Sequence, residues 1–291
     1  MCLGCLGIDC TGMVLIYNAS TMGRSRRASV EKYHDRVAAR YDQSYTDGYW
    51  QWRNALTWDY LKPFLPRDAN AQVVDLGCGT GTWGAKLAKS GYRVTSVDIS
   101  RQMLDQASRK IEEEVEGSPA RFVRADLCDL SELPKDTYSM AIALGDPIGC
   151  TRSPIKAMKQ IRRILREDGT LVATFDNRLA ALDFYLQAGD RQAMARFLRD
   201  GKTHWFTRDV EEQFPIFTFT PSGIRKLVAR SGFSVIEMVG VTVLPMRHYR
   251  GLLTSAEDRR AWAKTEKTLC RDEAAMGRAS HLQVVCRPTS A

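Results

Sequence analysis

The stretch that most constrains this chain of 291 residues is VVDLGCGTG, at residues 73–81. Val73, Val74 and Leu76 predict a buried strand, and a glycine-rich turn follows it directly. A glycine backbone adopts conformations barred to other residues and lets a ligand approach closely. Asp98 ends the next apolar run, about twenty residues downstream. At that spacing a carboxylate accepts both hydroxyls of a ribose, so the pattern predicts a nucleoside-containing ligand.

Two kinds of nucleoside ligand fit such a turn. Gly79, Gly81 and Gly84 form a literal G-x-G-x-x-G, which favours a dinucleotide and an NAD(P)-dependent oxidoreductase. Asp75 disfavours that interpretation, because a carboxylate beside the helix N-terminus repels a pyrophosphate bound there. S-adenosylmethionine has no phosphate, and a nearby carboxylate suits its sulfonium and ammonium groups. The methyl donor is therefore the favoured ligand, with the oxidoreductase kept as the alternative.

The D-x-G-x-G-x-G after an apolar strand resembles the first motif of the class I S-adenosylmethionine-dependent methyltransferases. Further segments match the family in order: RADL at 124–127, AIALG at 141–145 and LREDGTLVATF at 165–175. The layout is most similar to the small-molecule enzymes of the quinone-biosynthesis and glycine N-methyltransferase-like groups. The resemblance implies an α/β fold: a Rossmann-like, doubly wound, seven-stranded sheet whose last strand is antiparallel. It also implies N-terminal helices and a lid insertion after the fifth strand.

The resemblance further implies a set of cofactor-binding residues at the strand ends and on the N-terminal helices. Tyr33, Tyr41 and Arg53 are candidates for the methionine end, and an aromatic face suits a desolvated sulfonium. Docking of the helices onto the sheet accounts equally well for these aromatic residues. The full set is Tyr33, Tyr41, Arg53, Asp75, Gly77, Cys78, Gly79, Gly81, Asp98, Ile99, Met103, Ala125, Asp126, Leu127, Leu144 and Gly145.

The acceptor is harder to infer, because methyl transfer asks little of side chains. The sulfonium is already activated, so rate comes from positioning and from excluding water. A general base is needed only when the acceptor nucleophile carries a proton. The candidates for orienting the acceptor or taking that proton are Asp146, His204, His248 and Tyr249. No aromatic residue follows Asp146 and Pro147 as it does in base-methylating enzymes, which disfavours a nucleic-acid amine.

Hydrophobic periodicity predicts alternating strands and helices, and hence a parallel sheet with ligands at the carboxyl ends of its strands. Strands are expected at 72–76, 92–97, 120–124, 138–144, 170–175, 234–243 and 281–286. Helices are expected at 82–90, 100–114, 129–133, 153–166, 177–187, 191–199, 224–231 and 252–275, and Ser29 is a candidate cap for an N-terminal helix. Residues 1–28 read as a disordered extension and 29–291 as one domain. In that domain 29–66 cover the cofactor, and 177–220 form the lid.

Composition excludes other classes. No apolar run is long enough to cross a membrane, and the net charge of +8 is moderate. Cys2, Cys5 and Cys10 cluster without a histidine or second pair to complete a zinc set, so no metal is expected. We therefore expect a cytoplasmic monomer or homodimer that methylates a small molecule, without nucleic-acid or membrane partners, and releases S-adenosylhomocysteine. Two further functions fit the same motifs: an RNA or protein methyltransferase, and a non-catalytic cofactor-binding regulator.

Overall fold

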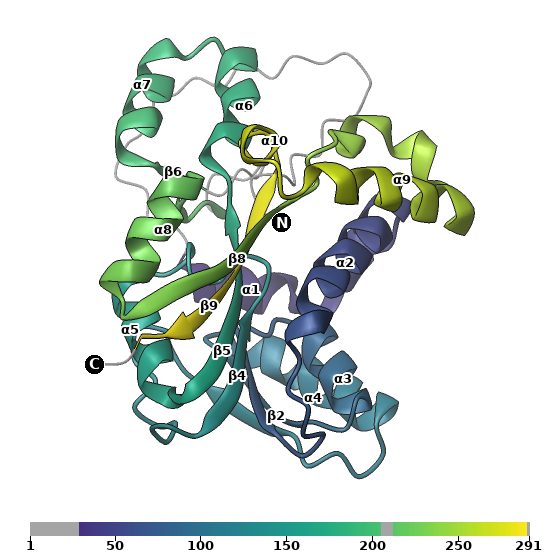
Figure 1. The fold of residues 1–291 in the computed structure, drawn as a ribbon, viewed down its shortest axis with the longest axis vertical. Coiled ribbons are helices and arrows are strands. Elements are labelled where there is room, and N and C mark those ends of the chain that lie inside the picture. Colours follow the sequence, from purple (N-terminus) through teal and green to yellow (C-terminus); the bar gives the residue numbers. More distant parts are fainter. Residues whose placement is uncertain (1–28, 205–211, 290–291) are drawn as a thin grey trace.

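The computed structural model describes residues 29–204 and 212–289, and a seven-stranded sheet lies at its centre (Figure 1). The strand order is β3-β2-β1-β4-β5-β9-β8. Strands β1 to β5 pair in parallel, whereas β9 runs antiparallel between β5 and β8. The strands are β1 Gln72–Leu76, β2 Arg93–Asp98, β3 Arg121–Arg124, β4 Tyr138–Ala143, β5 Leu165–Asp176, β8 Phe233–Val241 and β9 His281–Pro288. The expected seven-stranded, doubly wound sheet with an antiparallel last strand is confirmed.

Alternating side chains divide the sheet between two apolar cores. In β1, Val74 and Leu76 enter the core that α5 and α8 cover, and Val73 enters the core on the other face. Helices α3 and α4 lie over that second face, on the opposite side of the sheet in Figure 1. The bounds are α3 Thr82–Lys89, α4 Arg101–Glu114, α5 Pro154–Ile164 and α8 Pro221–Arg230. None of the helices described is long and apolar enough to span a membrane.

Two helices precede the sheet and reach its carboxyl edge. Helix α1 (Val30–Val37) begins at Ser29, whose hydroxyl accepts the Lys32 N–H at 3.2 Å, so the expected cap is present. Two short 3₁₀ turns, η2 Ala38–Arg40 and η3 Asp42–Tyr45, lead to α2 (Gly48–Leu61), which Asp47 caps. A further turn, η4 Lys62–Phe64, leads into β1.

The segment after β5 forms a small separate layer above the sheet edge (Figure 1). It contains η5 Arg178–Ala181, α6 Leu182–Gln187, α7 Arg191–Asp200, and the two-stranded sheet of β6 Lys202–His204 and β7 Pro215–Phe217. The chain then enters α8. An insertion after the fifth strand is therefore present where it was expected.

Three local predictions were wrong. Residues 129–133 form turns instead of a helix, because Asp126 and Asp129 accept the N–H groups of Cys128 and Ser131 in competition with helical bonds. The predicted helix over 252–275 is three elements: η7 Met246–Leu253, α9 Ala256–Leu269 and α10 Glu273–Met276. A capping box at Ser255 starts α9. Strand β5 begins five residues earlier than the expected start at 170. The predicted extension at 1–28 lies outside the described residues.

Candidate functional site

The loop after β1 carries its glycines for two different reasons. Gly77 (φ +67°) donates its N–H to the Val97 carbonyl at 2.7 Å, and a Cβ placed on it would overlap Pro147. Packing of the loop therefore requires a glycine there. Gly79 (φ +54°) has no heavy atom within 4 Å of the position that a Cβ would take. Its backbone faces open space, as a surface that binds a ligand closely must.

A cavity of about 120 Å³ opens beside this loop. Seven of the sequence-predicted cofactor residues line it: Tyr41, Arg53, Gly77, Cys78, Gly79, Leu144 and Gly145. Sequence reasoning missed seven others that also line it: Asp42, Tyr45, Trp50, Asn54, Thr80, Thr82 and Trp83. The cavity is smaller than the roughly 300–1,000 Å³ of ordinary small-molecule sites, so it has room for only part of a nucleoside ligand.

Asp98, the predicted ribose ligand, lies at the end of β2 and is only 8% exposed. Its two carboxylate oxygens accept the N–H groups of Gly79 and Ser100, each at 2.9 Å. Burial raises the pKa of Asp98, while His34 of α1 and these N–H groups oppose the rise. His34 is partly buried, and its removal from water lowers its pKa. The acid that should hold the ribose is therefore covered by α1.

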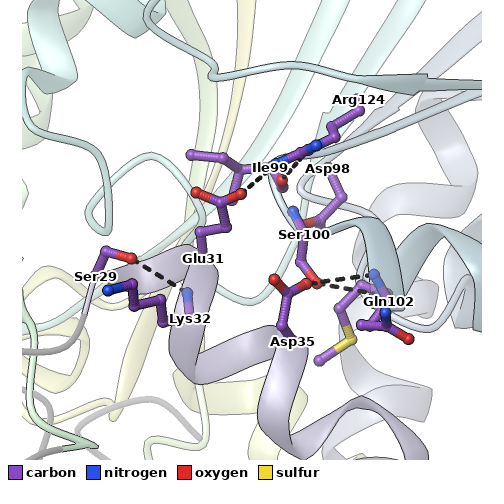
Figure 2. A network of polar contacts seen from close by, with 10 residues as sticks. Ser29, Glu31, Lys32, Asp35, Asp98, Ile99, Ser100, Gln102 and Arg124 are labelled. Carbon is purple, nitrogen blue, oxygen red and sulfur yellow. Dashed lines mark hydrogen bonds and ion pairs between the residues drawn. The ribbon is translucent and has the colours of Figure 1, made fainter.

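Figure 2 shows the polar contacts that attach α1 beside Asp98. Glu31 forms an ion pair with Arg124, whose Nε donates to the Ile99 carbonyl at 3.2 Å. Asp35 accepts the Ser100 hydroxyl at 2.6 Å and the Gln102 N–H at 3.3 Å. The contacts join α1 to the β2–α4 turn and to the end of β3. They lie on the Asp98 side of the loop, and Asp98 itself is not part of the cavity lining.

Most of the other predicted cofactor residues are near Asp98 but not in the cavity lining. The Ala125 N–H donates to the Asp98 carbonyl at 3.0 Å, which ties the end of β3 to that of β2. Asp126 accepts the Cys128 N–H at 2.8 Å and lies 3.4 Å from Arg152, and Leu127 belongs to the core. Ile99 is partly exposed beside them. Met103 and Tyr33 are buried together in the cluster between α1 and the insertion.

Asp75 and Gly81 serve the packing behind the loop. Asp75 is 1% exposed, and burial together with the nearby Asp98 charge raises its pKa to about 7, although the Gly84 N–H opposes this. The carboxyl group lies against the start of α3 and outside the cavity lining. A Cβ on Gly81 would approach Ala107 to 2.8 Å, so this glycine lets α3 and α4 pack closely.

The four acceptor-site candidates are not brought together. His204 lies on β6, and His248 and Tyr249 lie in η7, where Tyr249 is 56% exposed. None of these three lines the cavity. Asp146 directly follows the cavity residue Gly145 but is 1% exposed, with φ +61° and the Gly149 N–H bonded to its Oδ1 at 3.0 Å.

Asp146 has neighbours that the sequence did not single out. Burial raises its pKa well above the ordinary range, and the negative charge of Asp176 raises it further. His281, at the start of β9, lies 3.1 Å from Asp176 at the end of β5. A polar residue at each of these two strand ends was the available signal, but their adjacency depends on β9 inserting beside β5.

Comparison with known proteins agrees with this geometry. A family model described as a methyltransferase domain matches residues 73–169. The ubiquinone biosynthesis O-methyltransferase of Xylella fastidiosa is 25% identical over 243 residues, covering 77% of this chain and 92% of that protein. The tRNA U34 carboxymethyltransferase of Shewanella oneidensis is 30% identical over 123 residues, covering 42% of this chain and 36% of that protein. Four curated relatives, including the Shewanella protein, are matched over only 30% to 44% of their own length.

Among solved structures, a putative S-adenosylmethionine-dependent methyltransferase from Listeria monocytogenes superposes with a TM-score of 0.59 at 18% identity. The match covers 82% of this chain and all of the other (100%). At that identity the similarity concerns the fold. The motif, the family model over residues 73–169 and the strand order agree. Residues 73–169 are therefore a methyltransferase domain, and the fold around them is that of the class I S-adenosylmethionine-dependent methyltransferases.

Proposed function

We propose that this protein transfers the methyl group of S-adenosylmethionine to an N, O or S atom of a small-molecule acceptor. The observation that carries the proposal is the pairing of Gly79 with Asp98. The open backbone of Gly79 faces the cavity, and its N–H is bonded to the carboxylate at the end of β2. A sulfonium donor needs a close backbone surface and a ribose-binding acid at these two strand ends, and it needs no phosphate site.

Each wall of the cavity has a role in this proposal. Asp98 accepts the ribose hydroxyls, with Ile99, Met103 and the 125–127 segment around the adenine. Arg53 meets the methionine carboxylate, and the aromatic rings of Tyr41, Tyr45 and Trp50 face the sulfonium. The residues hold the donor in line with the acceptor and exclude water, which supplies most of the rate.

A small acceptor is supported by the enclosure of the site. Helix α2 walls one side of the cavity, and the insertion after β5 packs against α1. A relative matched over 92% of its length is named for ubiquinone biosynthesis. An RNA acceptor is the second candidate, favoured by the tRNA-modifying relative and the net charge of +8. The five cysteines in the described parts of the chain are free, which suits a reducing cytoplasm.

Calorimetric titration with S-adenosylhomocysteine, with NADH as the control ligand, tests the cofactor. We expect binding of the nucleoside thioether and none of NADH. Binding of NADH alone would overturn the proposal. Incubation of cell extract with labelled methyl donor then tests the acceptor. Label in the small-molecule fraction is expected, whereas label retained in RNA and lost on ribonuclease treatment would establish the second candidate.

The variant Gly79→Val locates the cofactor. Its side chain would occupy the open space beside the loop, so we expect loss of S-adenosylhomocysteine binding. The left-handed backbone adds a stability cost of about 1–2 kcal/mol, which thermal unfolding would measure. The matched variant Gly77→Val should instead lower the melting temperature strongly, because it overlaps Pro147. Unchanged binding by Gly79→Val would place the cofactor elsewhere.

A further inference from the structure

A polar patch is buried between the sheet and α2. Thr174 and Asp176 on β5 pair with Gln283 and His281 on β9, and each is at most 2% exposed. One step deeper on the same face, Val172 pairs with Val285 in the apolar core. Burying polar groups here costs free energy unless they satisfy one another, so a patch of this kind needs a reason beyond packing.

The centre of the patch is the pair formed by Asp176 and His281, with Oδ1 and Nε2 3.1 Å apart. Burial lowers the pKa of His281, and the positive charge of Arg53 lowers it further, while Asp176 opposes both. The ring is therefore neutral near pH 7. A neutral imidazole has one donor and one acceptor, so with Nε2–H toward the carboxylate, Nδ1 is left as an acceptor. A neutral His281 supplies no positive charge, and Arg53 is the side-chain cation whose charge acts on its ring.

Helix α2 is held in the register that brings Arg53 to His281. The Gln283 side-chain amide donates to the Thr57 carbonyl of α2 at 3.2 Å. Arg53 is four residues before Thr57, about 6 Å along a helix, and His281 is two residues before Gln283, about 6.6 Å along a strand. The two spacings match. The bond between Gln283 and Thr57 therefore fixes one end of the α2–β9 contact, and Arg53 lies near enough to His281 at the other for its charge to lower the pKa of the histidine.

Arg53 also faces the cavity. It is 6% exposed, lines the cavity beside Leu144 and Gly145, and its guanidinium carbon lies 5.5 Å from the centre of the Trp50 ring. A planar guanidinium binds a carboxylate best when its orientation is fixed beforehand. We propose that the Asp176–His281 pair is a positioning unit that fixes Arg53 so that its guanidinium binds the α-carboxylate of S-adenosylmethionine. This inference rests on the proposed function, because it assumes that the cavity takes that donor.

Two ligands separate this role from a structural one. S-adenosylhomocysteine carries the amino-acid carboxylate, whereas 5′-methylthioadenosine carries the same nucleoside without it. For the variant His281→Asn we expect the Kd of S-adenosylhomocysteine to rise about tenfold or more, the usual effect of losing a well-placed bond to a charged group. The Kd of 5′-methylthioadenosine should change less than about twofold. Both are measured by calorimetry, without any acceptor.

Arg53→Met supplies the second half of the test. If His281 acts through Arg53, adding His281→Asn to Arg53→Met should weaken S-adenosylhomocysteine binding no further. Gln51→Ala, at an exposed position of the same helix, is the matched control and should change neither Kd. Gln283→Leu should weaken S-adenosylhomocysteine more than 5′-methylthioadenosine, because it loosens the helix that carries Arg53. Asp176→Asn should repeat the selective loss, and it replaces His281→Asn should that variant fail to fold.

The possible outcomes are distinct. Equal losses for the two ligands in His281→Asn, or a further tenfold loss in the Arg53→Met background, would overturn the positioning role while leaving the methyltransferase proposal intact. Wild-type protein that binds neither ligand would overturn the proposed function itself.

Discussion

Helices α1 and α2 both lie at the carboxyl edge of the sheet, yet they are attached by opposite kinds of contact. Helix α2 buries Tyr49, Trp52, Leu56 and Tyr60 against β8 and the segments after it. Helix α1 contributes only Tyr33 and Val37 to the buried cluster that it shares with the insertion, and its other contacts to the sheet edge are polar and partly exposed. Buried apolar area supplies stability roughly in proportion to its size, whereas exposed ion pairs supply little.

The difference implies that α2 stays in place in the folded protein, whereas α1 can detach from the sheet edge. Regions with few buried apolar contacts open at lower free energy than the core of a domain. Helix α2, which presents Arg53 to the cavity, should leave only when the protein unfolds. Helix α1, which covers Asp98, should open without the rest of the fold.

The largest effect on stability should come from a substitution in α2. Trp52→Ala removes a fully buried indole from α2, so we expect unfolding free energy to fall by about 3–5 kcal/mol in urea titrations. The exposed neighbour Gln51, changed to Ala, is the matched control and should alter stability by less than about 0.5 kcal/mol. A loss of unfolding free energy below about 1 kcal/mol for Trp52→Ala would mean that its buried side chains do not hold α2 in place.

The second prediction concerns Asp98, the residue that α1 covers, changed to Ala. The change removes the carboxylate that should accept the ribose hydroxyls, at about 1.5–3 kcal/mol for a charged hydrogen bond, so S-adenosylhomocysteine should bind about 10–100-fold more weakly. Isothermal titration measures this change. The substitution also removes the acid next to His34, so amide hydrogen exchange should speed up in α1 and remain slow in α2. Unchanged affinity would show that the ribose lies elsewhere.

Lowering the pH should act on the two helices differently. Burial lowers the pKa of His34, so α1 is fully held above about pH 6.5, and its closure weakens as the pH falls and the released imidazole binds a proton. The slope is at most about 1.4 kcal/mol per pH unit for one proton. The pKa of His281 is also lowered by burial, but His281 lies under α2. Lowering the pH from 7.5 to 5.5 should therefore reduce the hydrogen-exchange protection of α1 before that of α2. The variant His34→Gln should remove this response.

The smallest effect should follow from cutting one polar attachment of α1. Asp35→Ala removes the acceptor for Ser100 and Gln102 at a partly exposed site, so global stability should fall by less than about 1 kcal/mol. Limited proteolysis between α1 and α2 should nevertheless become faster. If stability fell by several kcal/mol instead, α1 would belong to the same cooperative unit as α2.

The sheet and the glycine loop were predictable because each rests on local pattern. Val73, Val74 and Leu76 are short-range signals, and the spacing from Gly79 to Asp98 lies within one strand–helix–strand unit. Turns with side-chain acceptors, such as the one at Asp126, were not distinguished from a short helix. Sequence also located the insertion but not which of its residues pack on α1.

The position of α1 over Asp98 and the pairing of Asp176 with His281 could not be predicted from the sequence, because each joins segments that are far apart in the chain. The charges of His34 and Asp98 interact only because α1 folds back over the end of β2. Asp176 meets His281 only because β9 inserts beside β5. The candidates His204, His248 and Tyr249 were chosen by residue type, and the structure places them on β6 and η7, outside the cavity lining.

The position of α1 over Asp98 also has a consequence in time. A donor that docks fully only while α1 is lifted waits for that motion, so its association rate should level off at high concentration at the opening rate of the helix. Its apparent affinity is the intrinsic one multiplied by the open fraction. A rapid-mixing experiment should then find a donor that is slow to bind however much of it is supplied.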